Sequence, residues 1–69
     1  MEVKATMAGS VWKMTVAQGD SVEEGQDVVI LESMKMEIPI AAEQSGTVKE
    51  FKVQEGDFVN EGDVIAVIE

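Results

Sequence analysis

Short apolar segments separated by polar turns account for most of this chain. Valine, isoleucine and threonine gather in these segments, and Gly-Asp and Gly-Gln dipeptides lie between them. No stretch shows the 3.6-residue period of an amphipathic helix, whereas β-branched residues bounded by glycine-containing turns are typical of strands. The pattern predicts eight strands, near residues 2–6, 10–16, 20–22, 28–33, 36–41, 46–53, 57–59 and 64–68.

The second half of the chain repeats the first. G-D-S-V-E-E-G at residues 19–25 returns as G-D-F-V-N-E-G at residues 56–62, an offset of 37 positions (56 − 19). Over residues 7–32 and 44–69 this offset gives nine identical pairs: Gly9/Gly46, Val11/Val48, Val16/Val53, Gly19/Gly56, Asp20/Asp57, Val22/Val59, Glu24/Glu61, Gly25/Gly62 and Glu32/Glu69. Two copies are too few for a solenoid, so we expect them to close on each other about a pseudo-two-fold axis.

Four strands in each half predict an all-β fold. We expect a flattened barrel or sandwich of two four-stranded antiparallel sheets, a barrel-sandwich hybrid. The expected inward positions follow from the repeat: Val11, Val22, Val28 and Ile30 in the first half, and Val48, Val59, Ile65 and Val67 in the second. The equivalent residues Met14 and Phe51 are expected to pack beside them. Pro39 cannot donate a ladder hydrogen bond, so its nitrogen should face outward or lie at an irregular position.

Composition narrows the functional classes. The 69 residues predict a single domain, 1–69, with a small core and no cysteine to staple it. A net charge of −9 disfavours nucleic acid and anionic membranes as partners and favours a basic or mixed-charge surface, although acidity also serves solubility. The longest apolar run, residues 64–68, is too short to span a bilayer, and residues 1–3 lack signal-peptide character. We expect a soluble, cytoplasmic protein that is monomeric as an isolated domain.

Catalytic side chains are scarce. The chain contains no histidine and no cysteine, which removes the commonest general base and the best nucleophile. The acidic residues are spread through the turns without a calcium-binding loop motif, so a solvated face is favoured over a metal site. We therefore expect no catalytic residue, no metal site and no independent enzyme.

The remaining candidate is the triplet Met34-Lys35-Met36, which lies in the connection between the two copies, residues 33–43. Methionine is usually core filler, so one interpretation places both methionines on a buried strand face. The other interpretation is a projecting hairpin turn, because one half passes into the other here and apolar residues at a turn tip gain little from burial. An exposed lysine is almost wholly protonated at neutral pH. It is therefore a poor catalyst, but it is well presented to an acylating enzyme that can grip the two methionines.

The segment E-S-M-K-M-E-I-P at residues 32–39 resembles the biotin-attachment motif of biotinyl carrier domains, usually written E-A-M-K-M. The resemblance covers the whole chain, including A-T-M-A-G at residues 5–9, the two G-D-x-V-x-x-G turns and S-G-T-V at residues 45–48. It implies a flattened barrel with Lys35 at a hairpin tip, biotinylated by a biotin protein ligase through a biotinyl-adenylate. Met34 and Met36 would then be flanking recognition residues.

The resemblance also implies a role. Biotin on Lys35 would carry carboxylate between the biotin carboxylase and carboxyltransferase components of an acyl-CoA carboxylase, transcarboxylase or decarboxylase. Ser33 replaces the usual alanine, no proline stands near Met7, and the chain has no room for the extra thumb loop of some carriers. Two alternatives stay open. One is a lipoyl carrier of a 2-oxo acid dehydrogenase-type system, although lipoyl domains typically have Asp-Lys-Ala at the tip. The other is an unmodified β-barrel interaction module.

Overall fold

A computed structural model describes residues 1–69 and contains eight strands and no helix. The strands are β1 (Glu2–Lys4), β2 (Gly9–Met14), β3 (Ser21–Val22), β4 (Asp27–Ser33), β5 (Met36–Ala41), β6 (Gly46–Phe51), β7 (Phe58–Val59) and β8 (Val64–Ile68). Each predicted strand is present. Those predicted at 2–6, 10–16 and 46–53 end two residues early, at residues 4, 14 and 51. The structure holds no helix that is long and apolar enough to cross a membrane.

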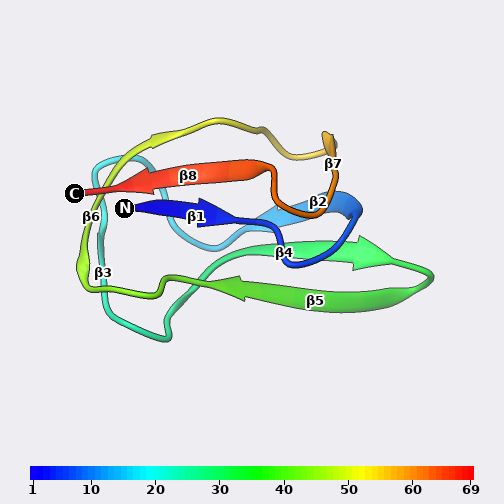
Figure 1. Cartoon of the computed structure of the whole chain (residues 1–69), viewed down its shortest axis with the longest axis horizontal. Helices are drawn as coiled ribbons and strands as arrows, with labels where there is room; N and C mark the ends of the chain where they lie inside the picture. Colours follow the sequence, from blue (N-terminus) through cyan, green and yellow to red (C-terminus); the bar gives the residue numbers. More distant parts are fainter.

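The strands form two four-stranded antiparallel sheets, with orders β1-β8-β6-β3 and β5-β4-β2-β7 (Figure 1). Adding 37 to the residue numbers of β2 and β3 gives β6 and β7, and adding it to residues 27–31 of β4 gives β8. β1 corresponds in the same way to the second half of β5. The two sheets are therefore equivalent in strand order, and the expected all-β, pseudo-two-fold fold is confirmed.

Hydrogen bonds between the halves follow the same symmetry. The Gly19 N–H donates to the Val48 carbonyl at 2.8 Å, and the Gly56 N–H donates to the Val11 carbonyl at 2.8 Å. Residues 19 and 56 differ by 37, as do residues 11 and 48. The two hydrogen bonds are therefore equivalent, and each half donates one of them to the other half. The two copies thus close on each other, as the repeat predicts.

The repeated Gly-Asp dipeptides build one turn twice. Gly19 and Gly56 adopt φ values of 92° and 93°, a region that residues with a Cβ rarely enter. The following aspartates then accept backbone hydrogen bonds at 2.9 Å, Asp20 Oδ2 from Ala17 and Asp57 Oδ2 from Gln54. Glycine supplies the backbone conformation and aspartate satisfies a free donor, which explains why both are retained in each copy.

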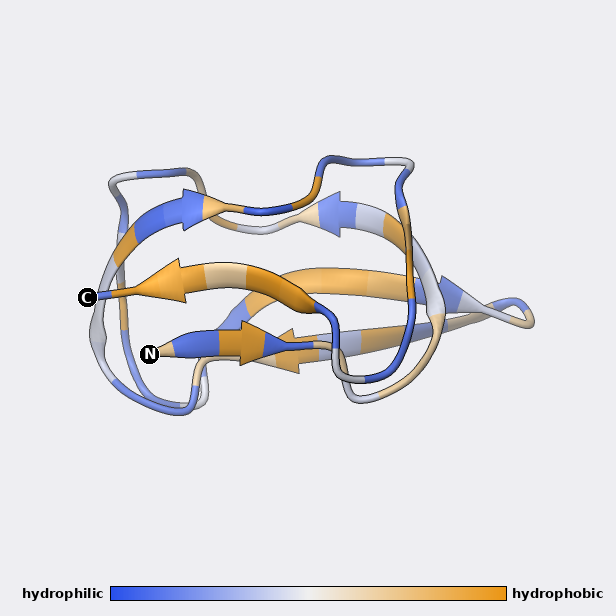
Figure 2. Ribbon diagram, turned by 45° about the horizontal axis from the view of Figure 1, so that its top comes forward, coloured by the Kyte–Doolittle hydropathy of each residue, from blue (hydrophilic) through white to orange (hydrophobic).

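The core lies between the sheets and consists of aliphatic side chains only. The buried hydrophobic residues are Val3, Ala5, Val11, Val22, Val28, Val29, Leu31, Ile40, Ala42, Val48, Val59, Ile65, Ala66 and Ile68. Met14 and Phe51 are partly buried against them, as expected. Figure 2 shows the hydrophobic colour along β8, the strand that runs to the C-terminus, and hydrophilic colour around the outer turns.

Two predicted core residues, Ile30 and Val67, are only partly buried, and that prediction was wrong. Val28 and Val29 are both buried in succession, because the register of β4 against β5 shifts between Asp27 and Val29. An irregularity of this kind reverses the in–out alternation of all later residues. Leu31 therefore faces the core in place of Ile30. Ile68 replaces Val67 in the same way, after Ile65 and Ala66 are buried in succession.

Pro39 satisfies its constraint through its position in the sheet. It lies in β5, an edge strand, where it pairs with Ile30 of β4 and is exposed. Edge strands tolerate proline because a missing N–H on the free side breaks no ladder hydrogen bond. The fifth strand can therefore return from the hairpin to the body of the domain without losing its pairing to β4.

Candidate functional site: the β4–β5 hairpin tip

The connection between β4 and β5 is a two-residue turn made of Met34 and Lys35. Ser33 pairs with Met36 to close it, and Glu32 pairs with Glu37 one step further back. Met34 has φ 52° and Lys35 has φ 65°, the only non-glycine residues with positive φ. Two positive values in a two-residue loop are the pattern of a type I′ turn, whose twist matches that of the flanking strands. The expected hairpin is present, and the alternative of a continuous buried strand is wrong.

The residues in this turn are poorly suited to its backbone. Type I′ turns favour Asn-Gly because both central residues need positive φ, and side chains with a Cβ lose energy there. A methionine and a lysine therefore hold a strained conformation that the flanking strands enforce. Strain of this kind gathers at functional sites, where it is retained for what the residues present.

The side chains of the tip point away from the domain. Met34 is 92% exposed and Met36 is 63% exposed, and Lys35 is exposed between them. The hairpin projects from the body along the longest dimension of the molecule, 31 Å, opposite the two chain ends (Figure 1). No pocket is found on the protein surface. The candidate site is therefore a projection that another protein can enclose.

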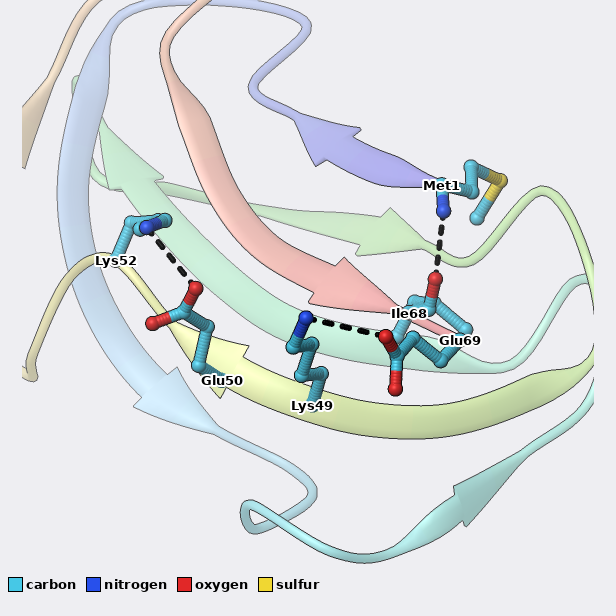
Figure 3. A network of polar contacts seen from close by, with 6 residues as sticks. All are labelled: Met1, Lys49, Glu50, Lys52, Ile68 and Glu69. Carbon is cyan, nitrogen blue, oxygen red and sulfur yellow. Dashed lines mark hydrogen bonds and ion pairs between the residues drawn. The ribbon is translucent and has the colours of Figure 1, made fainter.

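Lys35 has no carboxylate partner. The two ion pairs of the protein join Lys49 to Glu69 at 3.1 Å and Lys52 to Glu50 at 3.0 Å, on the other sheet and its continuation (Figure 3). The Lys35 amine is thus free to enter another active site without first breaking an ion pair. Glu32 and Glu37 are close to Lys35 in sequence, but neither forms an ion pair with it. They occupy facing positions of the β4–β5 ladder, and both are exposed.

The other four lysines have different settings. Lys4, Lys13 and Lys49 lie within strands, and Lys52 follows the last residue of β6. Lys35 alone lies in a turn, and it alone is flanked by exposed methionines. The structure thus brings together the three residues that the sequence indicated, Met34, Lys35 and Met36, at one solvent-exposed tip.

Comparison with known proteins places the chain in a family. The biotin/lipoyl family model, described as "Biotin-requiring enzyme", matches residues 1–68, so the chain belongs to this family. The resemblance recognised in the sequence, to biotinyl attachment domains, is confirmed.

Two curated relatives and one solved structure are informative. The Biotin/lipoyl attachment protein of Bacillus subtilis is 65% identical over 44 residues, 64% of this chain and 60% of that protein. The Biotinylated protein TB7.3 of Mycobacterium tuberculosis is 49% identical over 41 residues, 59% of this chain and 58% of that protein. The matches thus span less than two thirds of the length of these relatives. The urea carboxylase of Kluyveromyces lactis superposes on the whole chain with a TM-score of 0.94 and 39% identity, over 6% of its own length.

Proposed function

We propose that this chain is a biotinyl carrier, with biotin attached through an amide bond to Nζ of Lys35. The observation that carries the proposal is the placement of Lys35: an unpaired lysine at the tip of a projecting two-residue turn, between two exposed methionines, in a member of the biotin-requiring family. An amide requires a primary amine that can reach a second active site, and the tip supplies one. The residues present therefore fit the group.

The chain's own residues would present and position the group. The Lys35 amine would act as the nucleophile once the ligase has removed its proton, while Met34 and Met36 would offer apolar contacts to the ligase pocket. Biotin, when bound, supplies a ureido nitrogen that can carry a carboxylate. The antiparallel pairing of β4 with β5 would hold the turn clear of the domain, so that the attached arm can reach active sites in other proteins.

The proposed partners are a biotin protein ligase and the biotin carboxylase and carboxyltransferase components of a carboxylase, transcarboxylase or decarboxylase. Support comes from the solved urea carboxylase, of which the matching region is a small part. The chain would then be a non-catalytic carrier that shuttles carboxylate between two sites. We propose that it works in the cytoplasm and is monomeric as an isolated domain.

Lipoate is the second candidate group. The Bacillus subtilis relative is named for both biotin and lipoyl attachment, whereas the Mycobacterium tuberculosis relative is named as biotinylated. The mass of the intact native protein distinguishes a biotin adduct, a lipoate adduct and an unmodified interaction module, because the three masses differ.

The decisive variant is Lys35→Arg, which keeps the positive charge and removes the acylatable amine. Incubated with ligase, biotin and ATP, the wild type should gain one biotin and Lys35→Arg none, as read by intact mass and by streptavidin blotting. Lys13→Arg is the matched control, because Lys13 is also exposed but lies within β2. It should be labelled like the wild type. Full labelling of Lys35→Arg would disprove Lys35 as the attachment site.

A further inference from the structure

Two of the three aromatic residues of the protein are exposed on its surface. Trp12 is 48% exposed and Phe58 is 65% exposed, whereas Phe51 is packed against the core. Large exposed aromatics are costly in water, and Trp in particular is enriched among residues that dominate protein interfaces. These two side chains therefore need an explanation that the fold itself does not supply.

The two aromatics share one face of the β5-β4-β2-β7 sheet. Phe58 of β7 pairs with Ser10 of β2, and both are exposed. Trp12 lies two residues beyond Ser10 on the same strand, at the irregularity where the register of β2 against β4 shifts between Val11 and Lys13, and its side chain is exposed. Diagonal neighbours of this kind have Cα atoms about 7–8 Å apart, within reach of aromatic side chains. We therefore treat the exposed Trp12 and Phe58 side chains, on neighbouring strands, as one apolar patch.

The repeat provides an internal control. The positions equivalent to Phe58 and Trp12 in the other half are Ser21 and Lys49 (58 − 37 and 12 + 37). Ser21 pairs with Thr47 of β6 just as Phe58 pairs with Ser10 of β2. The same local structure is therefore built once with polar residues and once with aromatic ones. The aromatic pair is not required for folding, and it occurs only on the sheet that carries the Lys35 hairpin.

The patch lies close enough to the tip for one partner to cover both. Ser10 pairs with Glu32 of β4, three residues before Lys35. Two strand spacings across the sheet and three residues along it separate Phe58 from Lys35 by roughly 14 Å. A typical interface covers about 800 Å² on each partner, or roughly 30 Å across. Figure 1 shows β7 on the hairpin side of the molecule.

The charge of the surroundings selects the partner. The protein has a net charge of −9, and Glu32 and Glu37 face each other, unpaired, between the patch and the tip. A second copy of this chain would bring like charges together, as would a nucleic acid or an anionic membrane. A protein surface with arginine or lysine around an apolar centre would gain both charge attraction and cation–π contact with Trp12.

We propose that Trp12 and Phe58 form a second docking contact for the ligase that acylates Lys35, engaged by a basic, partly apolar surface of that enzyme. This inference rests on the proposed biotinyl-carrier function. The patch contacts the ligase, and Lys35 at the tip is the residue that reacts. Loss of the patch should therefore weaken binding of the carrier without slowing the chemical step once it is bound.

The test is the kinetics of biotin transfer to the double variant Trp12→Thr/Phe58→Ser. The Phe58→Ser change installs serine, the residue at the equivalent position 21 of the other half. KM for the carrier should rise about tenfold with kcat unchanged. The control variant Ser21→Ala/Lys49→Ala alters the equivalent positions of the other sheet and should behave as the wild type. Circular dichroism verifies the fold of both variants. An unchanged KM in the aromatic variant, or a fall in kcat alone, overturns the proposal.

A second measurement needs no change to the patch. Trp12 is the only tryptophan, so 5-fluorotryptophan labelling gives a single ¹⁹F resonance. In a Lys35→Arg background, which blocks turnover, addition of unlabelled ligase with biotin and ATP should shift or broaden this resonance. A resonance that stays unchanged at saturating ligase overturns the proposal. If the wild type itself gains no biotin on Lys35, the carrier function fails. If the wild type is labelled and the aromatic variant keeps the wild-type KM, only the docking proposal fails.

Discussion

The two ends of the molecule are built from equivalent pairs of strands but finish differently. At one end β4 and β5 are joined by the turn that carries Lys35; at the other, the equivalent strands β8 and β1 stop at the chain termini (Figure 1). The register is shared. Val29↔Ile40 and Ile30↔Pro39 correspond, through the offset of 37, to Ala66↔Val3 and Val67↔Glu2.

The correspondence continues to the last residues of the chain. Leu31 pairs with Ile38 at the hairpin end, and at the other end the Ile68 N–H donates to the Met1 carbonyl at 2.7 Å, with the Met1 amino group donating back at 2.6 Å (Figure 3). Residues 33–37 have no counterpart, and none of them is buried. The hairpin tip therefore contributes no buried side chain to the core.

The comparison is tested most strongly by removing equivalent core side chains from the two ends. Leu31→Ala and Ile68→Ala should each destabilise the protein by about 2–5 kcal/mol, because each removes a fully buried side chain and leaves a cavity. Denaturant titration measures both. Ile30→Ala and Val67→Ala, at partly buried positions, should cost about 1 kcal/mol or less. A larger loss at Ile30 than at Leu31 would contradict the burial pattern described for β4.

Crowding at the two ends gives the next largest effect. A Cβ added at Gly9 would lie 2.9 Å from the Glu32 carbonyl oxygen, and one added at Gly46 would lie 2.5 Å from the equivalent oxygen of Glu69. Gly9→Ala and Gly46→Ala should each cost about 1–3 kcal/mol through overpacking. The cost should be larger at Gly46, where the added atom also meets the buried Ile68 side chain.

Thermal or denaturant unfolding measures the stabilities of Gly9→Ala and Gly46→Ala. The exposed neighbours supply the controls: Ser10→Ala beside Gly9 and Thr47→Ala beside Gly46 should each change stability by less than about 0.5 kcal/mol. A stability of Gly46→Ala equal to that of the wild type would mean that Glu69 and Ile68 move aside. The two ends would then differ in rigidity as well as in connection.

The smallest expected effect on stability is at the tip itself. Met34→Asn should stabilise the fold by less than about 1 kcal/mol, because asparagine tolerates the positive φ of this position. The same change should lower kcat/KM for ligase-catalysed biotinylation, because an apolar contact is lost. Met36→Asn lies in β5 and should give no gain in stability. Equal stability changes in the two variants would show that the turn is unstrained.

Much of the fold followed from sequence because the repeat and its turn residues carry the information locally. Glycine at residues 19 and 56, each followed by aspartate, marked turns whose backbone only glycine adopts readily. The repeat then required the two halves to close on each other, since neither could bury its apolar side chains alone. The position of Lys35 followed from the same reasoning, because the connection between the copies had to turn.

The features that depend on strand register, such as which residues face the core, were decided only by the tertiary structure. Residues 28–31 are all apolar, so no pattern in them reveals where the irregularity lies or that Leu31, rather than Ile30, faces the core. The equivalence of β1 with the end of β5, which shortens the unique segment from 33–43 to 33–37, was hidden by low sequence similarity.

The sequence by itself determined the strands, the symmetry and the residues Met34, Lys35 and Met36 as the candidate site. Those features depend on local conformational preference and on a repeat that can be read along the chain. The positive φ of Met34 and Lys35, and the placing of Trp12 and Phe58 on the face beside them, depend on which strands pair and in what register. Pairing is a long-range choice that buries one face and exposes the other, and the tertiary structure makes that choice.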